Sequence, residues 1–305
     1  MMRRVACVVL AAAALAVARG AVAGQVFVNV APGSNIFSPS TVATLNTGDH
    51  VIWHWAAGGH TVTSGNPNTG TKSGLFDSNV SGGTQALGTV FSWKTSGTSP
   101  VSYFCQPHRP SMQGSIVFPV GATIEADFRI TEVRFDGVSL NFVEIANLGD
   151  DVGDLAGFRL VINGTATTLT SQILNPGERV TFPNPSGLGT SGSVALYAPE
   201  TIASGSNPGP SLTDATMMID YVEWGTAGNQ PLESTAAATT QPVVWTAGQF
   251  APQAAGGHSI VFCGLRFQHG AGFWNETRFP TPAAVNDCVN PTLPSTWGRI
   301  KTLYR

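Results

Sequence analysis

The sequence predicts an all-β protein in which two β-sandwiches follow each other in one chain. Its apolar residues come in short runs rich in Val, Ile, Phe and Thr, and Gly, Pro, Asn and Ser separate these runs. Helical periodicity is nearly absent. With 305 residues, 42% of them hydrophobic, the chain is long enough for two domains and too apolar to be disordered.

Residues 1–23 have the features of a secretory signal. A short basic start with Arg3 and Arg4 precedes an apolar run over 5–17, and the small residues Ala21-Val22-Ala23 suit a signal peptidase. We therefore expect an exported protein, periplasmic, extracellular or held at the cell surface. The Arg pair leaves twin-arginine export as a less favoured alternative. No stretch reaches the roughly 20 apolar residues of a membrane helix, so no membrane span is expected in the mature protein.

The charge balance argues against a nucleic-acid partner. The chain has 15 Lys and Arg residues, and losing Arg3, Arg4 and Arg19 with the signal leaves 12 against 18 acidic residues, a net charge of −6. A chain this acidic binds phosphate backbones poorly.

The first domain is expected over 24–120, with a boundary at about 120–124. Runs bounded by turn residues predict its strands at 26–30, 41–45, 50–55, 88–93, 101–104 and 114–118. A sandwich of seven or eight strands fits this length. A second β-rich stretch begins near Glu125, where 128–133 alternates between apolar and polar residues.

The residues best suited to chemistry lie at the end of the first domain. The segment YFCQPHRPSMQG at 103–114 places Cys105, His108 and Met112 in one loop between two predicted strands. A copper ion that cycles between Cu(I) and Cu(II) prefers a Cys thiolate, two imidazoles and a weak thioether. The second imidazole is expected from His60, in GGHTVTS at 58–64, because the preceding strand would carry it to the same end of the sandwich.

This first domain resembles the plastocyanin-like blue copper proteins, or cupredoxins. The segments NIFSP at 35–39 and GDHVIW at 48–53 are similar to the first half of that family, and the likeness covers about residues 25–119. The resemblance implies a Greek-key sandwich with one type 1 copper site held by His60, Cys105, His108 and Met112. The spacer between His108 and Met112 is one residue shorter than in typical plastocyanins.

The resemblance implies an electron carrier and not an enzyme. Four protein ligands leave no position open for a substrate, so outer-sphere electron transfer with redox proteins that dock near His108 is expected. The six His of the chain include no His-x-His pair, which argues against an oxygen-reducing multicopper oxidase. No nucleophile elbow or phosphate loop is present. A copper-holding or surface-binding protein without redox turnover is the alternative.

The remaining cysteines and histidines are expected to be structural. Cys263 and Cys288 are separated by Gly- and Pro-containing sequence that lets a loop close, so a disulfide between them is predicted, which leaves Cys105 free. Along 50–55 the side chains alternate between two faces, with Val51, Trp53 and Trp55 expected in the core. His50 and His54, on the other face, are then expected to face solvent. His258 and His269 are expected to have structural or surface roles.

The second domain, at 125–288, resembles the lamin-tail domain, an immunoglobulin-like β-sandwich. The segments that carry the likeness are VEIAN at 143–147, DLAGFRL at 154–160, LNPGE at 174–178, IDYVEWG at 219–225 and PTPAAVN at 280–286. The resemblance implies attachment or partner binding, to a ligand that the sequence does not identify, and no catalytic residues.

Several features of the second domain have a structural interpretation. Glu144, Asp154 and Asp220 are expected to bond turn amides or face solvent. The stretches 183–216 and 225–256, rich in small and polar residues, are predicted to be surface insertions. The tail at 289–305 is basic and aromatic over 297–305. It is interpreted either as a recognition tag or as a docked or frayed chain end, and the sequence does not decide between them.

Overall fold

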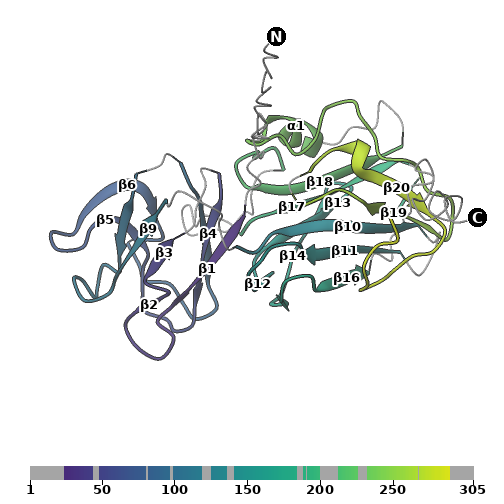
Figure 1. Ribbon diagram of the computed structural model, residues 1–305. Helices are drawn as coiled ribbons and strands as arrows, with labels where there is room; N and C mark the ends of the chain where they lie inside the picture. Colours follow the sequence, from purple (N-terminus) through teal and green to yellow (C-terminus); the bar gives the residue numbers. More distant parts are fainter. Residues whose placement is uncertain are drawn as a thin grey trace, which may run out of the picture.

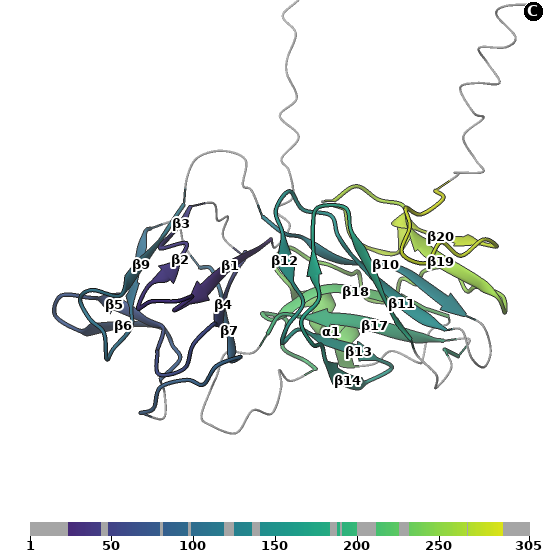
Figure 2. The same cartoon turned by 90° about the horizontal axis from the view of Figure 1, so that it is seen from below.

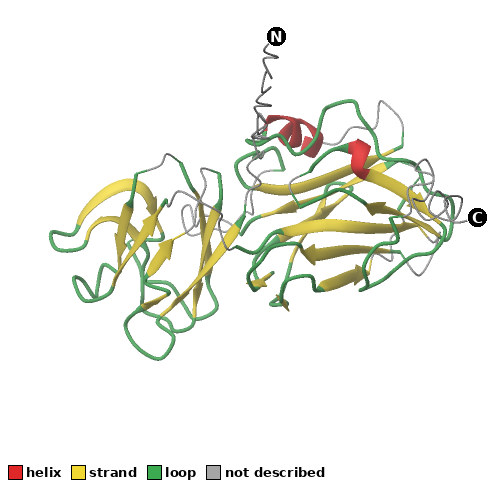
Figure 3. Ribbon diagram, in the orientation of Figure 1, coloured by secondary structure: helices red, strands yellow, loops and turns green. Residues whose placement is uncertain are grey.

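The computed structural model consists of two β-sandwiches side by side, and Figure 3 shows how little of the chain is helical. The all-β prediction is confirmed. The structure describes residues 24–43, 48–79, 82–96, 99–118, 125–135, 141–183, 188–189, 191–199, 212–225, 232–266 and 268–288. The predicted signal, the predicted boundary at 120–124 and the tail at 289–305 lie outside these residues. None of the described helices is both long and apolar enough to cross a membrane.

The first sandwich packs a four-stranded sheet against a five-stranded one. The four-stranded sheet has the order β2 (Phe37–Ser38), β1 (Gln25–Val30), β4 (His50–Trp55) and β7 (Val90–Lys94). The five-stranded sheet has the order β3 (Thr41–Ala43), β9 (Gln113–Val117), β8 (Val101–Phe104), β5 (Thr63–Asn66) and β6 (Thr71–Asp77). The sequence did not predict β2, β5 or β6. In β6 the first five residues are exposed, so no apolar alternation marks it.

The core of the first sandwich is aromatic. Val51, Trp53 and Trp55 are all buried in it, as the alternation along β4 predicts. Trp53 contacts the rings of Phe76, Phe91 and Tyr103 at centroid distances of 5.1, 5.5 and 5.5 Å. These contacts join β4 to both sheets and fix the strands that end at the copper-ligand candidates.

The second sandwich also has two main sheets. One has the order β16 (Arg179–Pro183), β11 (Phe142–Asn147), β10 (Phe128–Phe135), β19 (His258–Phe262) and β20 (Trp274–Thr277). The other has the order β14 (Thr165–Thr168), β13 (Arg159–Ile162), β17 (Gly192–Tyr197) and β18 (Met218–Trp224). The short pair β12 (Gly153–Asp154) and β15 (Ile173–Leu174), helix α1 (Leu232–Thr239) and the 3-10 turn η1 (Ala271–Phe273) complete it.

Two stretches predicted as surface insertions hold core elements instead. The stretch 183–216 contains β17, which pairs with β13 and β18 and is buried from Ser193 to Tyr197. The stretch 225–256 contains α1 and the buried Trp245, whose ring meets that of Tyr221 at 5.6 Å. The prediction was wrong because the apolar runs in these stretches are short and lie between small and polar residues. They are still long enough to form a strand or a short helix.

The outer face of the four-stranded sheet packs on the second sandwich. In both views, β4 lies on the side of the first sandwich that faces the second (Figure 1; Figure 2). Ile52 is fully buried in the core of the second sandwich, and Phe27 and Val90 pack against the same core. Phe27 meets Phe128 at a centroid distance of 6.1 Å. A Cβ at Gly153 would lie 2.9 Å from the Phe27 ring, so this close approach needs glycine.

This contact corrects the prediction that His50 and His54 face solvent. Both share the face of Ile52, as the alternation predicts, but a second domain covers that face. His50 is fully buried, and neither ring nitrogen has a hydrogen-bond partner among the described residues. His54 Nδ1 lies 3.7 Å from an oxygen of Asp154, and the side chain is 18% exposed. A sequence pattern reports the two faces of a strand but not what covers them.

Glu144 and Asp154 of the second sandwich bond amides of its connecting segments, as predicted. The prediction was wrong for Asp220, which is buried and bonds groups of a strand. Glu144 accepts the Ala283 amide at 2.8 Å. Asp154 accepts the amides of Ala156 and Gln172, each at 3.0 Å. Asp220 accepts the Ile130 amide at 2.9 Å and pairs with Arg129 Nε at 3.1 Å. The last two partners are a strand amide and a buried guanidinium, so Asp220 ties β18 to β10.

A disulfide joins Cys263 to Cys288 across 25 residues. The segment before Cys288 is also held by carboxylates: Glu132 accepts the Thr281 amide and hydroxyl at 3.1 and 3.0 Å. Asn286 donates to the carbonyl of Thr131 at 2.7 Å. The segment 280–288 is therefore fastened to β10 and β11 by polar contacts as well as by the disulfide.

Replacing Ile52 with alanine should lower the free energy of unfolding by about 2–5 kcal/mol, because deleting buried methyl groups loses transfer free energy and leaves a cavity. Ile36, which is 47% exposed, supplies the matched control. Ile36→Ala should stay within about 0.5 kcal/mol of the unchanged protein. Denaturant unfolding of the full chain, followed by tryptophan fluorescence, measures both. Equal losses in the two variants would contradict the packing of this face.

Acid should weaken the structure through His50. Burial, with a smaller effect of Lys94, lowers the pKa of His50 from 6.5 to about 3. The unfolded chain therefore takes up a proton below pH 6.5 that the folded chain refuses until about pH 3, so stability falls as the pH drops through this window. One such proton changes the free energy by up to about 1.4 kcal/mol per pH unit. Denaturant midpoints between pH 7 and 4 should fall less in His50→Leu, and equal slopes would refute the assignment.

Candidate metal centre

Three donor side chains from two distant parts of the chain meet at one end of the first sandwich. His60 lies in the loop between β4 and β5, Cys105 directly follows β8, and His108 lies in the turn that leads to β9. Cys105 Sγ is 3.8 Å from His60 Nδ1 and 3.3 Å from His108 Nδ1. The three potential ligand atoms lie within 4.8 Å of one another, and the described residues contain no other such group of three or more.

Backbone hydrogen bonds shape the turn that carries Cys105, His108 and Met112. The Cys105 amide donates to the Met112 carbonyl at 3.0 Å, and the Met112 amide donates to the His108 carbonyl at 2.9 Å. The His108 amide donates in turn to the Cys105 carbonyl at 3.2 Å. Met112 is fully buried in the same core cluster as Cys105. The turn thus brings the predicted thioether residue back beside the thiol residue.

Contacts around Thr61 position the Cys105 sulfur. The Thr61 amide donates to Cys105 Sγ at 3.3 Å, and the Thr61 hydroxyl lies 4.0 Å from the same sulfur. The hydroxyl also accepts the Gln106 amide at 2.8 Å. An amide that points at sulfur stabilises a thiolate over a thiol. Thr61 therefore connects the two segments that supply the donors.

Sequence reasoning missed Thr61 as well as Trp55 and Gln85, which hold the His60 loop. Trp55 donates from Nε1 to the His60 carbonyl at 3.1 Å. The Gln85 amide donates to the same carbonyl at 2.9 Å. These contacts use backbone atoms of His60 and Thr61, which leave no side-chain pattern in the sequence. The one signal was the position of Thr61 directly after the candidate ligand.

Burial sets the charge state of the donors in the absence of a metal. Burial raises the pKa of the Cys105 thiol, and the amide of Thr61 opposes that rise. Burial and the neighbouring His108 lower the pKa of His60. The centre therefore favours a neutral imidazole at His60, which is the form that binds a metal. A bound cation would supply the charge that stabilises the thiolate.

The spacing of the donors fits a trigonal metal ion. Metal bonds of about 2.0 Å to nitrogen and about 2.3 Å to sulfur, set at 120°, separate the two atoms by about 3.7 Å. The observed separations between Cys105 Sγ and the two Nδ1 atoms are 3.8 and 3.3 Å. Two imidazoles and a thiolate are donors that copper and zinc both accept. The side chains are thus arranged to bind a first-row metal ion with little rearrangement.

The other histidines take no part in this cluster. His258 Nδ1 lies 2.6 Å from a Glu276 oxygen at the surface of the second sandwich. His269 Nδ1 lies 3.3 Å from Asp220 and 3.0 Å from Arg129 Nη2, in a buried polar group. Both have the structural or surface role expected for them.

A metal-free chain produced without residues 1–23, and therefore without Cys7, should contain one free thiol. Cys105 is fully buried and the other two cysteines form the disulfide. DTNB should therefore react slowly with the native protein and release one equivalent quickly after denaturation without reductant. Cys105→Ser should release none. Three reactive thiols in the denatured protein would contradict the disulfide, and immediate reaction of the native protein would contradict the burial of Cys105.

Solved structures similar to this chain are cupredoxins. A purple cupredoxin from Nitrosopumilus maritimus has 18% identity, covers 30% of this chain and 98% of its own, and gives a TM-score of 0.25. A mutant fern plastocyanin has 19% identity, covers 31% of this chain and 100% of its own, and gives a TM-score of 0.24. Auracyanin A from Chloroflexus aurantiacus has 13% identity, covers 31% of this chain and 98% of its own, and gives a TM-score of 0.25. No family model matches the chain. No curated protein matches it either.

Proposed function

We propose that the first sandwich is a type 1 copper site that carries electrons, with His60, Cys105, His108 and Met112 as the ligands. The observation that carries the proposal is the approach of two imidazole Nδ1 atoms, from distant loops, to one buried cysteine sulfur at 3.8 and 3.3 Å. Among first-row metals, copper alone combines this donor set with a nearby methionine as a weak fourth ligand.

The surroundings of the donors favour electron transfer over substrate chemistry. When bound, copper would supply a one-electron Cu(I)/Cu(II) couple. The three backbone hydrogen bonds within the turn and the Thr61 amide on sulfur hold the donors in one arrangement. Cys105 and Met112 are fully buried, and His60 is 5% exposed, which keeps water away. A fixed, dry donor set with four protein ligands suits outer-sphere transfer and leaves no open position for a substrate.

His108 is the exit for the electron in this proposal. It is half-buried, whereas the other three candidate ligands are buried. Next to the His60 loop, Leu87 is 69% exposed and lies two residues after Gln85, the bridge partner of His60. An exposed apolar residue close to the site gives a redox protein a surface to dock on. The second sandwich packs on another face, the outer side of the four-stranded sheet, through Ile52 and Phe27.

The second sandwich has the role of an attachment or partner-binding module in this proposal, on the basis of its likeness to lamin-tail domains. An exported chain would then combine an electron carrier with a domain that holds it near its partners. Export follows from the predicted signal at 1–23. The alternative function is a copper-holding or surface-binding protein without redox turnover. Burial of three of the four candidate ligands also suits such a role.

The proposal is tested by adding Cu(II) to the purified mature protein and recording visible and EPR spectra. An intense thiolate-to-copper band and a narrow copper hyperfine splitting are expected, because a short bond to Cys105 spreads the unpaired electron onto sulfur. Cys105→Ser should abolish the band, and His60→Ala and His108→Ala should weaken or remove it. His258→Ala, which changes a histidine of the second sandwich, is the matched control and should keep the spectrum.

Redox measurements separate the two functions. Reversible voltammetry and fast electron self-exchange between oxidised and reduced protein support the carrier. Tight copper binding with slow exchange supports the copper-holding alternative. A protein that stays colourless and binds no copper would refute both roles for the metal.

A further inference from the structure

The buried amide of Gly24 marks the junction of the two sandwiches. Gly24 directly precedes β1 and is buried. Its nitrogen donates to Asp49 Oδ1 at 3.0 Å, and its carbonyl accepts the His50 amide at 2.8 Å. Asp49 itself is fully buried. The start of β1 is thus held against the start of β4 by a carboxylate on the Gly24 nitrogen.

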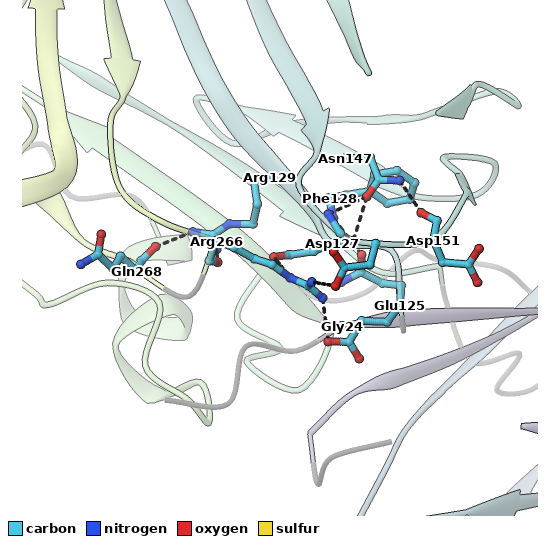
Figure 4. A network of polar contacts seen from close by, with 12 residues as sticks. Gly24, Glu125, Asp127, Phe128, Arg129, Asn147, Asp151, Arg266 and Gln268 are labelled. Carbon is cyan, nitrogen blue, oxygen red and sulfur yellow. Dashed lines mark hydrogen bonds and ion pairs between the residues drawn. The ribbon is translucent and has the colours of Figure 1, made fainter. Parts of the chain in front are cut away.

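Glu125, at the start of the second sandwich, covers Gly24 from the other side. A Cβ on Gly24 would lie 2.0 Å from the carboxyl carbon of Glu125, so a larger residue here would have to displace the Glu125 carboxylate. Figure 4 shows Gly24 beside Glu125, within the polar network of Arg266. Arg266 donates from Nη2 to Glu125 Oε1 at 3.0 Å, and it also pairs with Asp127 and Asp150.

The groups around the Gly24 nitrogen are rich in negative charge. Asp49 and Glu125 flank Gly24, and Arg266 is shared among three carboxylates. Lys94 is a further cation near Asp49: burial lowers the pKa of Lys94, and the carboxylates of Asp214 and Asp49 oppose that effect. A positive charge on the Gly24 nitrogen would lie 3.0 Å from a buried carboxylate oxygen, where an ion pair is least screened.

The predicted signal sequence offers a source for that charge. Ala21 and Ala23 are small, as a signal peptidase requires before its cleavage site. Cleavage after Ala23 would make Gly24 the first residue of the mature chain. In that hydrolysis, water adds across the Ala23–Gly24 peptide bond. Ala23 leaves as a carboxylate, and the Gly24 nitrogen takes a proton and becomes an α-ammonium group.

We propose that cleavage after Ala23 creates a buried ion pair between the α-ammonium of Gly24 and Asp49, which locks the junction of the two sandwiches. The proposal rests on the export part of the proposed function and does not depend on copper. One residue further on, the amide and carbonyl of Gln25 bond those of Ala126 at 2.9 and 3.0 Å. The side chain of Gln25 accepts the Phe128 amide at 2.9 Å. The ion pair therefore acts where β1 meets the second sandwich.

The first test locates the mature N-terminus. The full chain is produced in a secreting host, and the exported protein is analysed by intact mass and N-terminal sequencing. A chain that starts at Gly24 is expected. A start at any other residue, including a cyclised Gln25, would overturn the proposal.

The second test compares the Gly24 chain with a chain that starts at Ala23, which differs by one residue and moves the ammonium away from Asp49. The extended chain should unfold at a midpoint lower by about 2–8 °C, as expected when a buried ion pair loses one partner in a protein of this size. Asp49→Asn should remove most of that difference between the two chain lengths. An equal midpoint for the two chains, or a difference that persists in Asp49→Asn, would overturn the proposal.

A third measurement needs no substitution, in case Asp49→Asn does not fold. An amine-reactive reagent at neutral pH should label the α-amine of the Gly24 chain much more slowly than that of the Ala23 chain, and equally fast after denaturation. Equal labelling of the two native proteins would refute the buried ammonium. Copper spectra of both chains should be the same, so a failure of the copper proposal leaves this comparison intact.

Discussion

The candidate metal centre depends on how the turn between β8 and β9 is closed. Three backbone hydrogen bonds, from Cys105 to Met112, from Met112 to His108 and from His108 to Cys105, wind eight residues into a compact turn. Backbone bonds are directional, so they fix where each side chain starts. The thiol, one imidazole and the thioether residue therefore share one place before any metal binds. His60 is the one donor that needs a long-range contact, and its neighbour Thr61 provides it through Cys105 Sγ and the Gln106 amide, while Trp55 and Gln85 hold the His60 carbonyl.

Strand β4 is packed into the cores of both sandwiches. Trp53 and Trp55 on one face of β4 pack into the first core, whereas Ile52 on the other face packs into the second core. A single strand thus transmits the position of the second sandwich to the loop that carries His60. Packed interiors deform little, so a strand held on both faces keeps that loop in place.

The sequence predicted the metal-donor candidates well, because their combination in one loop is unusual. It misled where one domain covers the surface of the other. Cys105, His108 and Met112 within one loop form an unusual combination, and the structure gathers the first two with His60. The strands 50–55 and 101–104 were predicted to the residue, because their apolar alternation is strong. The burial of His50 was missed, since one strand cannot reveal that another domain covers it. β17 was missed because its apolar run is short and stands among Gly, Ser and Thr.

The chain places many of its few charges inside the protein. Charged residues make up 11% of the sequence, and nine of those that the structure describes are buried: Asp49, Glu125, Asp127, Arg129, Glu132, Glu144, Asp220, Glu223 and Glu233. A buried ion pair adds little net stability over well-packed apolar residues, because desolvation offsets much of the attraction, although removing one of its partners is costly. The contribution of several of these buried charges is to fix the relative positions of segments, because they make directional polar contacts with specific partners. Glu132 and Glu144 fix the segment that ends in the disulfide, Asp220 fixes β18 to Arg129, and Glu125 fixes the domain junction to Arg266. Each of these contacts specifies where one segment must lie, which apolar packing alone leaves less defined.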